Sequence, residues 1–140
     1  MAHSPLRRLF LSLALAATVC AAFGGVAGQE AHPAPYTAAQ AEAGRETYQA
    51  ICAACHMPDL VGSDDAPPLT GAYFASSWVG YPVSTLLEFV QGNMPLTVPG
   101  SLNEEEYVTV VAYLLSMNGA PAGDTPLTMG AAGVIASGER

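Results

Sequence analysis

Residues 52–56, Cys-Ala-Ala-Cys-His, constrain this chain more than any other part of its sequence. Two thiols three positions apart can each add to one vinyl group of a porphyrin. The histidine that follows directly can then bind the central iron. This C-x-x-C-H spacing is the attachment signature of c-type haem. We therefore expect one haem c, bound covalently through Cys52 and Cys55, with His56 as an iron ligand.

Two other interpretations of these residues need a setting that the rest of the sequence does not supply. A thioredoxin-like thiol pair needs a βαβ unit around it, and a tetrahedral zinc site needs four ligands, usually from a second Cys or His pair. The chain contains neither pattern. A haem-free thiol oxidoreductase thus stays an alternative that rests on the cysteine pair alone.

Residues 1–28 have the features of a secretory signal peptide. Arg7 and Arg8 precede a short apolar run, and small residues lead to the expected cleavage site. The run is too short for a membrane anchor and is followed by two glycines. Cys20 raises the question of a lipid-modified N-terminus, but the valine before it is bulkier than such sites usually accept. We expect an exported, periplasmic protein with no membrane span after cleavage.

The charge balance restricts the partners of the chain. The sequence has 4 Lys+Arg against 12 Asp+Glu, and all four basic residues are arginines. Loss of Arg7 and Arg8 with the signal would leave a formal charge of −10. This charge argues against binding to nucleic acid or to an anionic membrane surface. We expect redox partner proteins that present a basic or uncharged face.

Hydrophobic periodicity predicts an all-α domain with three principal helices and long loops. The sequence Thr-Ala-Ala-Gln at 37–40 matches a capping box and predicts a helix over 38–51, which ends in the cysteine motif. Apolar residues at helical spacing predict a second helix over 82–91. Asn103, followed by three glutamates, caps a third helix with one apolar stripe that ends near residue 118.

The chain divides into four segments by composition. The signal (1–28) is followed by a flexible lead-in (29–36), a folded domain (37–119) and a tail rich in Gly, Ala and Pro (120–140). We expect the tail to be loosely packed or disordered. Residues 59–80 are expected to be mostly loop, because Gly, Ser, Asp and Pro are frequent there. Such long loops are unusual in a small domain, unless they wrap a planar cofactor.

Few residues can supply a sixth iron ligand on the face opposite His56. Met57 adjoins that histidine and lies on its side of the ring, Met117 falls in the last helix, and Met129 falls in the tail. Met94 lies in a loop after a helix, before a proline that can hold it rigidly. Its thioether is a soft ligand that stabilises ferrous iron. We therefore favour Met94 as a metal ligand, and a histidine of the lead-in, His32, is the less favoured alternative.

From about residue 38 to 119 the chain resembles the class I mono-haem c-type cytochromes. The likeness is carried by Gly44 and Tyr48, by the motif at 52–56, by Pro-Pro-Leu-Thr-Gly at 67–71 and by Ala-Tyr-Leu at 112–114. It implies a small cytochrome c fold in which the last helix crosses the first at Gly44. It also implies that the Pro67 carbonyl accepts a hydrogen bond from His56 and that Met94 is the distal ligand.

Residues 93–95 and 99–107 are similar, more particularly, to cytochrome subunits or domains that accept electrons from periplasmic quinoprotein (pyrroloquinoline-quinone) dehydrogenases. This resemblance implies that Trp78 and Tyr81 hydrogen-bond a haem propionate, with packing at the haem rim as an equal alternative. We expect an electron carrier and not an enzyme by itself, although it can be the cytochrome subunit of a dehydrogenase complex. Another cytochrome or an oxidase would accept the electron. The alternative is a haem c sensor or catalytic haem subunit with an open or displaceable sixth site.

Overall fold

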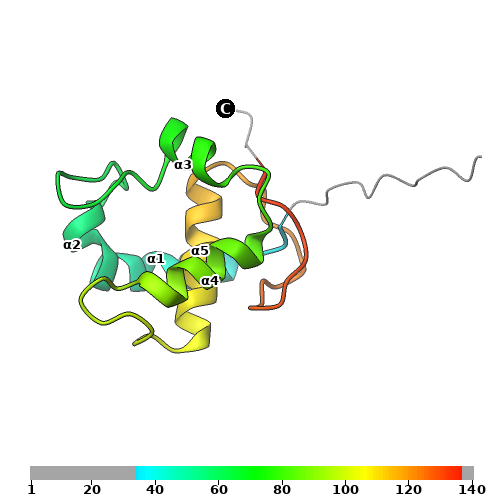
Figure 1. Cartoon of the computed structure of the whole chain (residues 1–140). Coiled ribbons are helices and arrows are strands. Elements are labelled where there is room, and N and C mark those ends of the chain that lie inside the picture. Colours follow the sequence, from blue (N-terminus) through cyan, green and yellow to red (C-terminus); the bar gives the residue numbers. More distant parts are fainter. Residues whose placement is uncertain (1–33, 137–140) are drawn as a thin grey trace, which may run out of the picture. The chain divides into compact units, whose positions relative to one another are not determined.

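In a computed structural model of the protein, residues 34–136 are described, and they belong to one compact unit. This part of the chain is helical and contains no strand, only one isolated antiparallel bridge between Pro82 and Val134 (Figure 1). The expected all-α class is confirmed. None of its helices is long and apolar enough to cross a membrane. The expected signal peptide and His32 lie outside the described residues.

The first helix begins where the capping box predicts. In α1 (Ala38–Thr47) the Gln40 amide donates to Thr37 Oγ1 over 3.2 Å, and the Gln40 side chain accepts from the Thr37 amide over 3.1 Å. The helical path then widens into a π turn, η2 (Tyr48–Cys52), and closes as α2 (Ala53–His56). The predicted helix is thus continued through the motif, and the widened turn contains Cys52. Single π turns of this kind are frequent at functional sites.

The prediction that 59–80 is mostly loop is wrong for its last third, because α3 covers Gly71–Trp78. The domain therefore has a fourth helix of at least eight residues besides the three expected. Phe74 is buried and Trp78 is partly buried. These two aromatics lie four positions apart on one face, and this spacing is the signal in the sequence that indicates the helix.

The two remaining helices lie close to their predicted bounds. The second predicted helix is α4 (Val83–Asn93), and the third is α5 (Glu104–Met117). Asn103 caps α5 as expected, because its side chain accepts from the Glu106 amide over 3.0 Å. The Glu106 carboxylate accepts in turn from the Asn103 amide over 2.8 Å. Two orphan backbone donors at the start of α5 are satisfied in this way.

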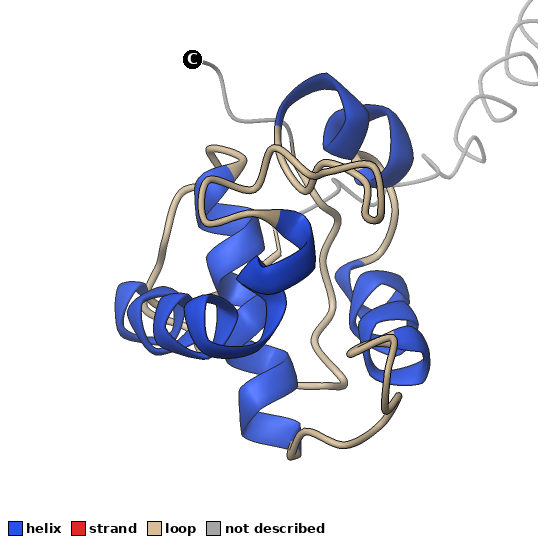
Figure 2. Ribbon diagram, turned by 90° about the vertical axis from the view of Figure 1, so that its left-hand side faces the viewer, coloured by secondary structure: helices blue, strands red, loops and turns tan. Residues whose placement is uncertain are grey.

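Helix α5 is the element against which α1 and α4 pack. It crosses α1 closely and also contacts α4, and both figures show α1 lying across it (Figures 1 and 2). At the crossing, a Cβ on Gly44 would lie 1.8 Å from the backbone oxygen of Thr109. One helical turn farther on, the rings of Tyr48 and Tyr113 pack at an angle of 53° with centroids 5.3 Å apart. The close crossing implied by the resemblance is therefore confirmed.

The expectation of a loosely packed tail is wrong for residues 120–136. Leu127 and Ile135 are buried in the core. The Gln40 side chain holds the backbone of Leu127 from both sides, donating to its oxygen over 2.9 Å and accepting from its amide over 2.8 Å. The Ile135 amide donates to Tyr81 O over 2.9 Å. Large side chains are few in this segment, so its composition did not indicate that it packs on the core. We refer to residues 120–136 as the C-terminal strap.

The strap also holds the described end of the lead-in. Ala34 and Tyr36 are buried, and the Tyr36 hydroxyl donates to the backbone oxygen of Ala120. The Ala34 amide donates to Val134 O over 2.9 Å. The two ends of the domain are therefore joined to each other and packed on the helices.

The crossing at Gly44 gives a direct stability test. Gly44→Ala should lower the free energy of unfolding by about 3 kcal/mol or more, because the added methyl group meets backbone that cannot rotate away. Gly92→Ala is the matched control, since Gly92 lies in α4 with open space where its Cβ would be. In that helix alanine should be neutral or stabilise by up to about 1 kcal/mol. Denaturant unfolding measures both, and equal effects would contradict the account of the crossing.

Candidate haem site

The two cysteines of the motif are unpaired and differ in environment. Cys52 lies in the π turn, partly buried against the core, whereas Cys55 is exposed on α2. Burial, with a smaller contribution from Cys55, raises the pKa of the Cys52 thiol to about 11. A redox-active thiol pair needs a thiolate with a lowered pKa. The first cysteine has the opposite property, which argues against a thioredoxin-like pair.

The zinc interpretation gains no support from the arrangement of possible ligands. Within residues 34–136, no group of three or more His, Cys, Asp or Glu side chains lies close enough together to hold a metal ion. A structural zinc site needs four such ligands. The motif therefore stands by itself in the described part of the chain, as a haem attachment site would.

The histidine of the motif is oriented by a hydrogen bond to the loop that follows. His56 is buried, and its Nδ1 lies 2.9 Å from the backbone oxygen of Pro67. A carbonyl oxygen only accepts, so Nδ1 must carry the proton and Nε2 then has its lone pair free. A metal-bound histidine is usually oriented by a partner of this kind. The contact implied by the resemblance is present, and it leaves Nε2 available to bind a metal.

The loop after the motif is folded back by several short contacts. The Gly62 amide donates to His56 O over 3.1 Å, and the Ser63 hydroxyl donates to Cys55 O over 2.9 Å. Gly62 has a φ of +76°, and a Cβ there would lie 2.6 Å from the nitrogen of Pro68. Glycine at this position is thus required for the loop to return to the histidine with the Pro67 carbonyl.

The residue directly after the motif adopts a backbone conformation that favours glycine. Met57 has φ 65° and ψ 151°, a region that costs other residues on the order of 1–3 kcal/mol. The buried Tyr48 hydroxyl donates to Met57 O over 2.8 Å and holds this turn in place. The strained backbone of Met57 therefore lies directly after His56. It is held by Tyr48, whose ring packs on α5.

Met94 is positioned by groups on two helices. It follows α4 directly and is partly buried, and its amide donates to Val90 O over 2.8 Å. Its backbone oxygen accepts from the hydroxyl of Tyr107 on α5 over 2.9 Å. The sequence places Tyr107 in the apolar stripe of α5, and nothing there indicated this contact beyond the rule that a buried tyrosine hydroxyl finds a partner.

Trp78 is positioned by packing. It ends α3 and lies partly buried against the core, with its ring 5.2 Å from that of Phe89 on α4. Tyr81 is exposed. Of the predicted site residues, His56 and Pro67 are thus joined directly, whereas Met94 and Trp78 have other partners, Tyr107 and Phe89.

Large apolar side chains are exposed on the segments that carry these residues. They come from the π turn, the loop after the motif, α3, the link to α4, α4 itself and the loop after Met94: Ile51, Val61, Tyr73, Tyr81, Phe89, Leu96 and Val98. None of them comes from α1, α5 or the C-terminal strap. Exposed apolar side chains that collect on particular segments mark an interaction site. A planar apolar macrocycle bound through Cys52, Cys55 and His56 fits this distribution.

Comparisons with known proteins agree with this geometry. The family model described as "Cytochrome C oxidase, cbb3-type, subunit III" matches residues 39–114. No curated protein matches the sequence. Among solved structures, the sulfane dehydrogenase SoxCD from Paracoccus pantotrophus is similar, with 26% sequence identity and a TM-score of 0.52. The match covers 72% of this chain and 53% of that one, so the chain spans about half the length of the protein it matches.

The family match includes the motif, the Pro67 loop, Met94 and most of α5. It covers more than half of the chain, and the similar structure carries the same helical arrangement over a still larger part. The chain therefore belongs to this cytochrome c family, and it is a c-type cytochrome of class I.

Proposed function

We propose that this protein is a periplasmic electron carrier with one haem c. Thioether bonds from Cys52 and Cys55 hold the haem, and His56 and Met94 are the axial ligands of its iron. The observation that carries the proposal is the His56 ring, buried beside two unpaired cysteines and oriented by the Pro67 carbonyl at 2.9 Å. This arrangement leaves Nε2 free to ligate, and it has no other evident use in the described residues.

The bound haem supplies a one-electron change between ferric and ferrous iron, and the protein controls its surroundings. The Pro67 carbonyl makes His56 a stronger donor, because it accepts the Nδ1 proton. The thioether of Met94 favours the ferrous state. With ligands on both faces, no position is open for a substrate, and for this reason we propose a carrier and not an enzyme by itself.

The donor we propose is a periplasmic dehydrogenase. The similar structure is that of a dehydrogenase, which supports a donor of this class. That protein is a sulfane dehydrogenase, so the proposal for this chain names the class of dehydrogenase alone. The arginine pair, apolar run and small residues at the start of the sequence support export. Another cytochrome or an oxidase would receive the electron.

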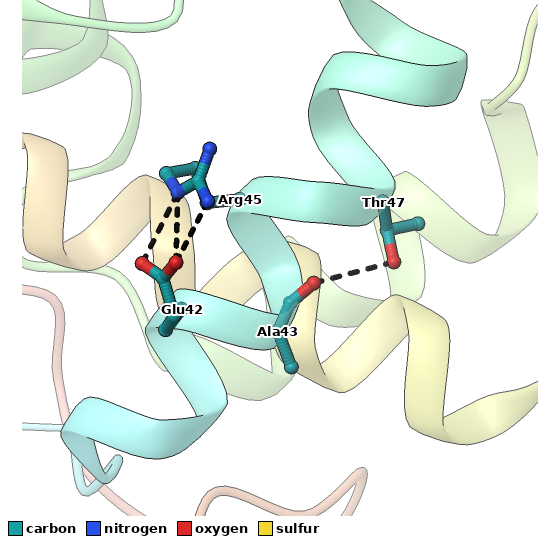
Figure 3. A network of polar contacts seen from close by, with 4 residues as sticks. All are labelled: Glu42, Ala43, Arg45 and Thr47. Carbon is teal, nitrogen blue, oxygen red and sulfur yellow. Dashed lines mark hydrogen bonds and ion pairs between the residues drawn. The ribbon is translucent and has the colours of Figure 1, made fainter.

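The surface charge indicates the kind of partner. Arg45 is the one basic residue between residues 34 and 136, and its guanidinium lies 2.7 Å from the Glu42 carboxylate (Figure 3). This hydrogen-bonded pair lowers the pKa of Glu42 and raises that of Arg45. No other cationic side chain of the described residues is offered to a partner. Docking would therefore use a basic or uncharged face of the partner against an acidic protein.

The covalent bond to the haem is the first test. The protein, expressed in a bacterial host that attaches haem to exported apoproteins, should keep its colour after denaturation and acidic organic extraction. The double variant Cys52→Ala/Cys55→Ala is the control and should lose the colour to the solvent. Colour that leaves the wild-type protein would reject haem c. Ferrous wild-type protein that binds carbon monoxide readily at neutral pH would favour the sensor with an open sixth site.

Replacement of the distal ligand tests the second axial bond. Met94→Ala should abolish the sulfur-to-iron charge-transfer band of the oxidised protein and lower its reduction potential, because the soft thioether is lost. Met129→Ala is the control, since Met129 is partly buried against the core and lies in the strap. It should leave the band and the potential unchanged. A visible spectrum and a redox titration measure both, and an unchanged spectrum of Met94→Ala would reject this ligand.

The loop that carries Pro67 can be disturbed without touching the ligands. Gly62→Ala should destabilise the protein by about 3 kcal/mol or more, because its methyl group meets the backbone of this loop. It should also raise the reduction potential, since a weaker hydrogen bond makes His56 a poorer donor. Gly71→Ala is the control, as Gly71 has a φ of +70° but open space around its Cβ position. It should cost only about 1–2 kcal/mol and leave the potential unchanged.

A further inference from the structure

The hydroxyl of Tyr107 connects the two ends of the segment that begins with Met94. The side chain is fully buried on α5. Its hydroxyl donates to Met94 O over 2.9 Å and accepts from the Leu102 amide over 3.3 Å. We refer to residues 94–102 as the methionine loop. One hydroxyl group thus closes this loop at both of its ends.

The methionine loop has little else that ties it to the domain. Leu96 and Val98 within it are 75% and 59% exposed, so they do not anchor it by burial. Its first residue continues α4, because the Met94 amide donates to Val90 O over 2.8 Å. The other backbone hydrogen bonds of the loop are internal, from Val98 to Pro95 O, from Gly100 to Met94 O and from Ser101 to Val98 O, at 2.9, 3.4 and 3.3 Å. These bonds shape the loop but do not fix it on α5. Among the described residues, the Tyr107 hydroxyl is therefore the polar contact that joins the loop to α5.

Tyr107 also lies beside the close crossing of α1 and α5. Two residues farther along α5, the backbone oxygen of Thr109 meets Gly44 at the close crossing with α1. Helix α1 leads through the π turn to the cysteine motif. The same turn of α5 therefore contacts the methionine loop through Tyr107 and contacts α1, which leads to His56, through Thr109.

We propose that Tyr107 is a positioning residue for Met94, which holds the methionine loop so that the thioether stays on the iron. This inference rests on the proposed function, in which Met94 is the distal ligand. For an external ligand to bind, the bond between sulfur and iron must break and the methionine loop must move away. The two hydrogen bonds of Tyr107 oppose this movement, so their loss favours the open loop.

The test uses the haem-loaded protein and imidazole as the competing ligand. The chain contains no lysine that could compete for the iron from within. Imidazole replaces the sulfur, and the loss of the sulfur-to-iron band of the ferric protein measures its dissociation constant. In Tyr107→Phe, imidazole should bind about five- to thirtyfold more tightly, the change that corresponds to the loss of one to two ordinary hydrogen bonds.

Tyr113→Phe is the matched control. Tyr113 lies on the same helix and is also buried, but its ring packs on Tyr48 and not on the methionine loop. The control should bind imidazole as the wild-type protein does. Equal constants for the wild type and both variants would overturn the role of Tyr107, and so would an equal increase in affinity in both variants.

The failure of the proposed function has a different signature. If Met94→Ala retains the sulfur-to-iron band, Met94 is not the ligand, and the proposal for Tyr107 falls with it. If Met94→Ala loses the band but Tyr107→Phe behaves like Tyr113→Phe, only the positioning role is overturned.

A measurement on the wild-type protein keeps the proposal testable if Tyr107→Phe does not fold. The amide of Leu102 should exchange its hydrogen slowly, because the Tyr107 hydroxyl accepts it. The amide of Thr97, an exposed residue of the same loop, serves as the internal reference. Exchange of Leu102 at the rate of Thr97 would overturn the proposal, and clear protection of Leu102 alone would support it.

Discussion

The close crossing of α1 and α5 is the contact on which both sides of the haem site depend. Gly44 lets the backbone of α1 approach Thr109, and the tilted rings of Tyr48 and Tyr113 pack one helical turn away. A helix cannot bend easily over so short a distance, so this contact fixes the direction in which the chain reaches the cysteine motif. The other end of α5 contributes as well. The Asn118 side chain donates to Leu69 O over 3.0 Å and so holds the end of the loop that carries Pro67.

Helix α5 thus contacts both of the elements that carry the proposed axial ligands, His56 and Met94. Through the crossing it positions the helix of His56, and through Tyr107 it holds the loop of Met94. The π turn and the strained backbone of Met57 are local departures from regular structure that lie directly beside the motif. Such departures persist only where the surrounding contacts maintain them. Here one of these contacts is the hydrogen bond from the Tyr48 hydroxyl to Met57 O.

The C-terminal strap shows how a sequence of small residues can still complete a core. Two buried side chains, Leu127 and Ile135, and the paired hydrogen bonds of Gln40 hold it in place. The strap also joins the described end of the lead-in to the link between α3 and α4, because Val134 and Ile135 pair with Ala34 and Tyr81. A small domain gains from such closure, since its helices alone bury a limited apolar area.

The sequence by itself determined the features that depend on neighbours within one or two turns. The capping boxes at Thr37 and Asn103, the apolar stripe of α5 and the cysteine motif are all of this kind, and the resemblance to cytochromes added the Pro67 contact and the crossing at Gly44. The tertiary structure decided α3, the packing of the strap and the partner of the Tyr107 hydroxyl. In each of these the decisive contact joins groups far apart in the chain, or depends on one or two buried side chains in a segment of weak periodicity. Local propensity carries no information about such contacts, because their free energy arises only after the chain has folded back on itself.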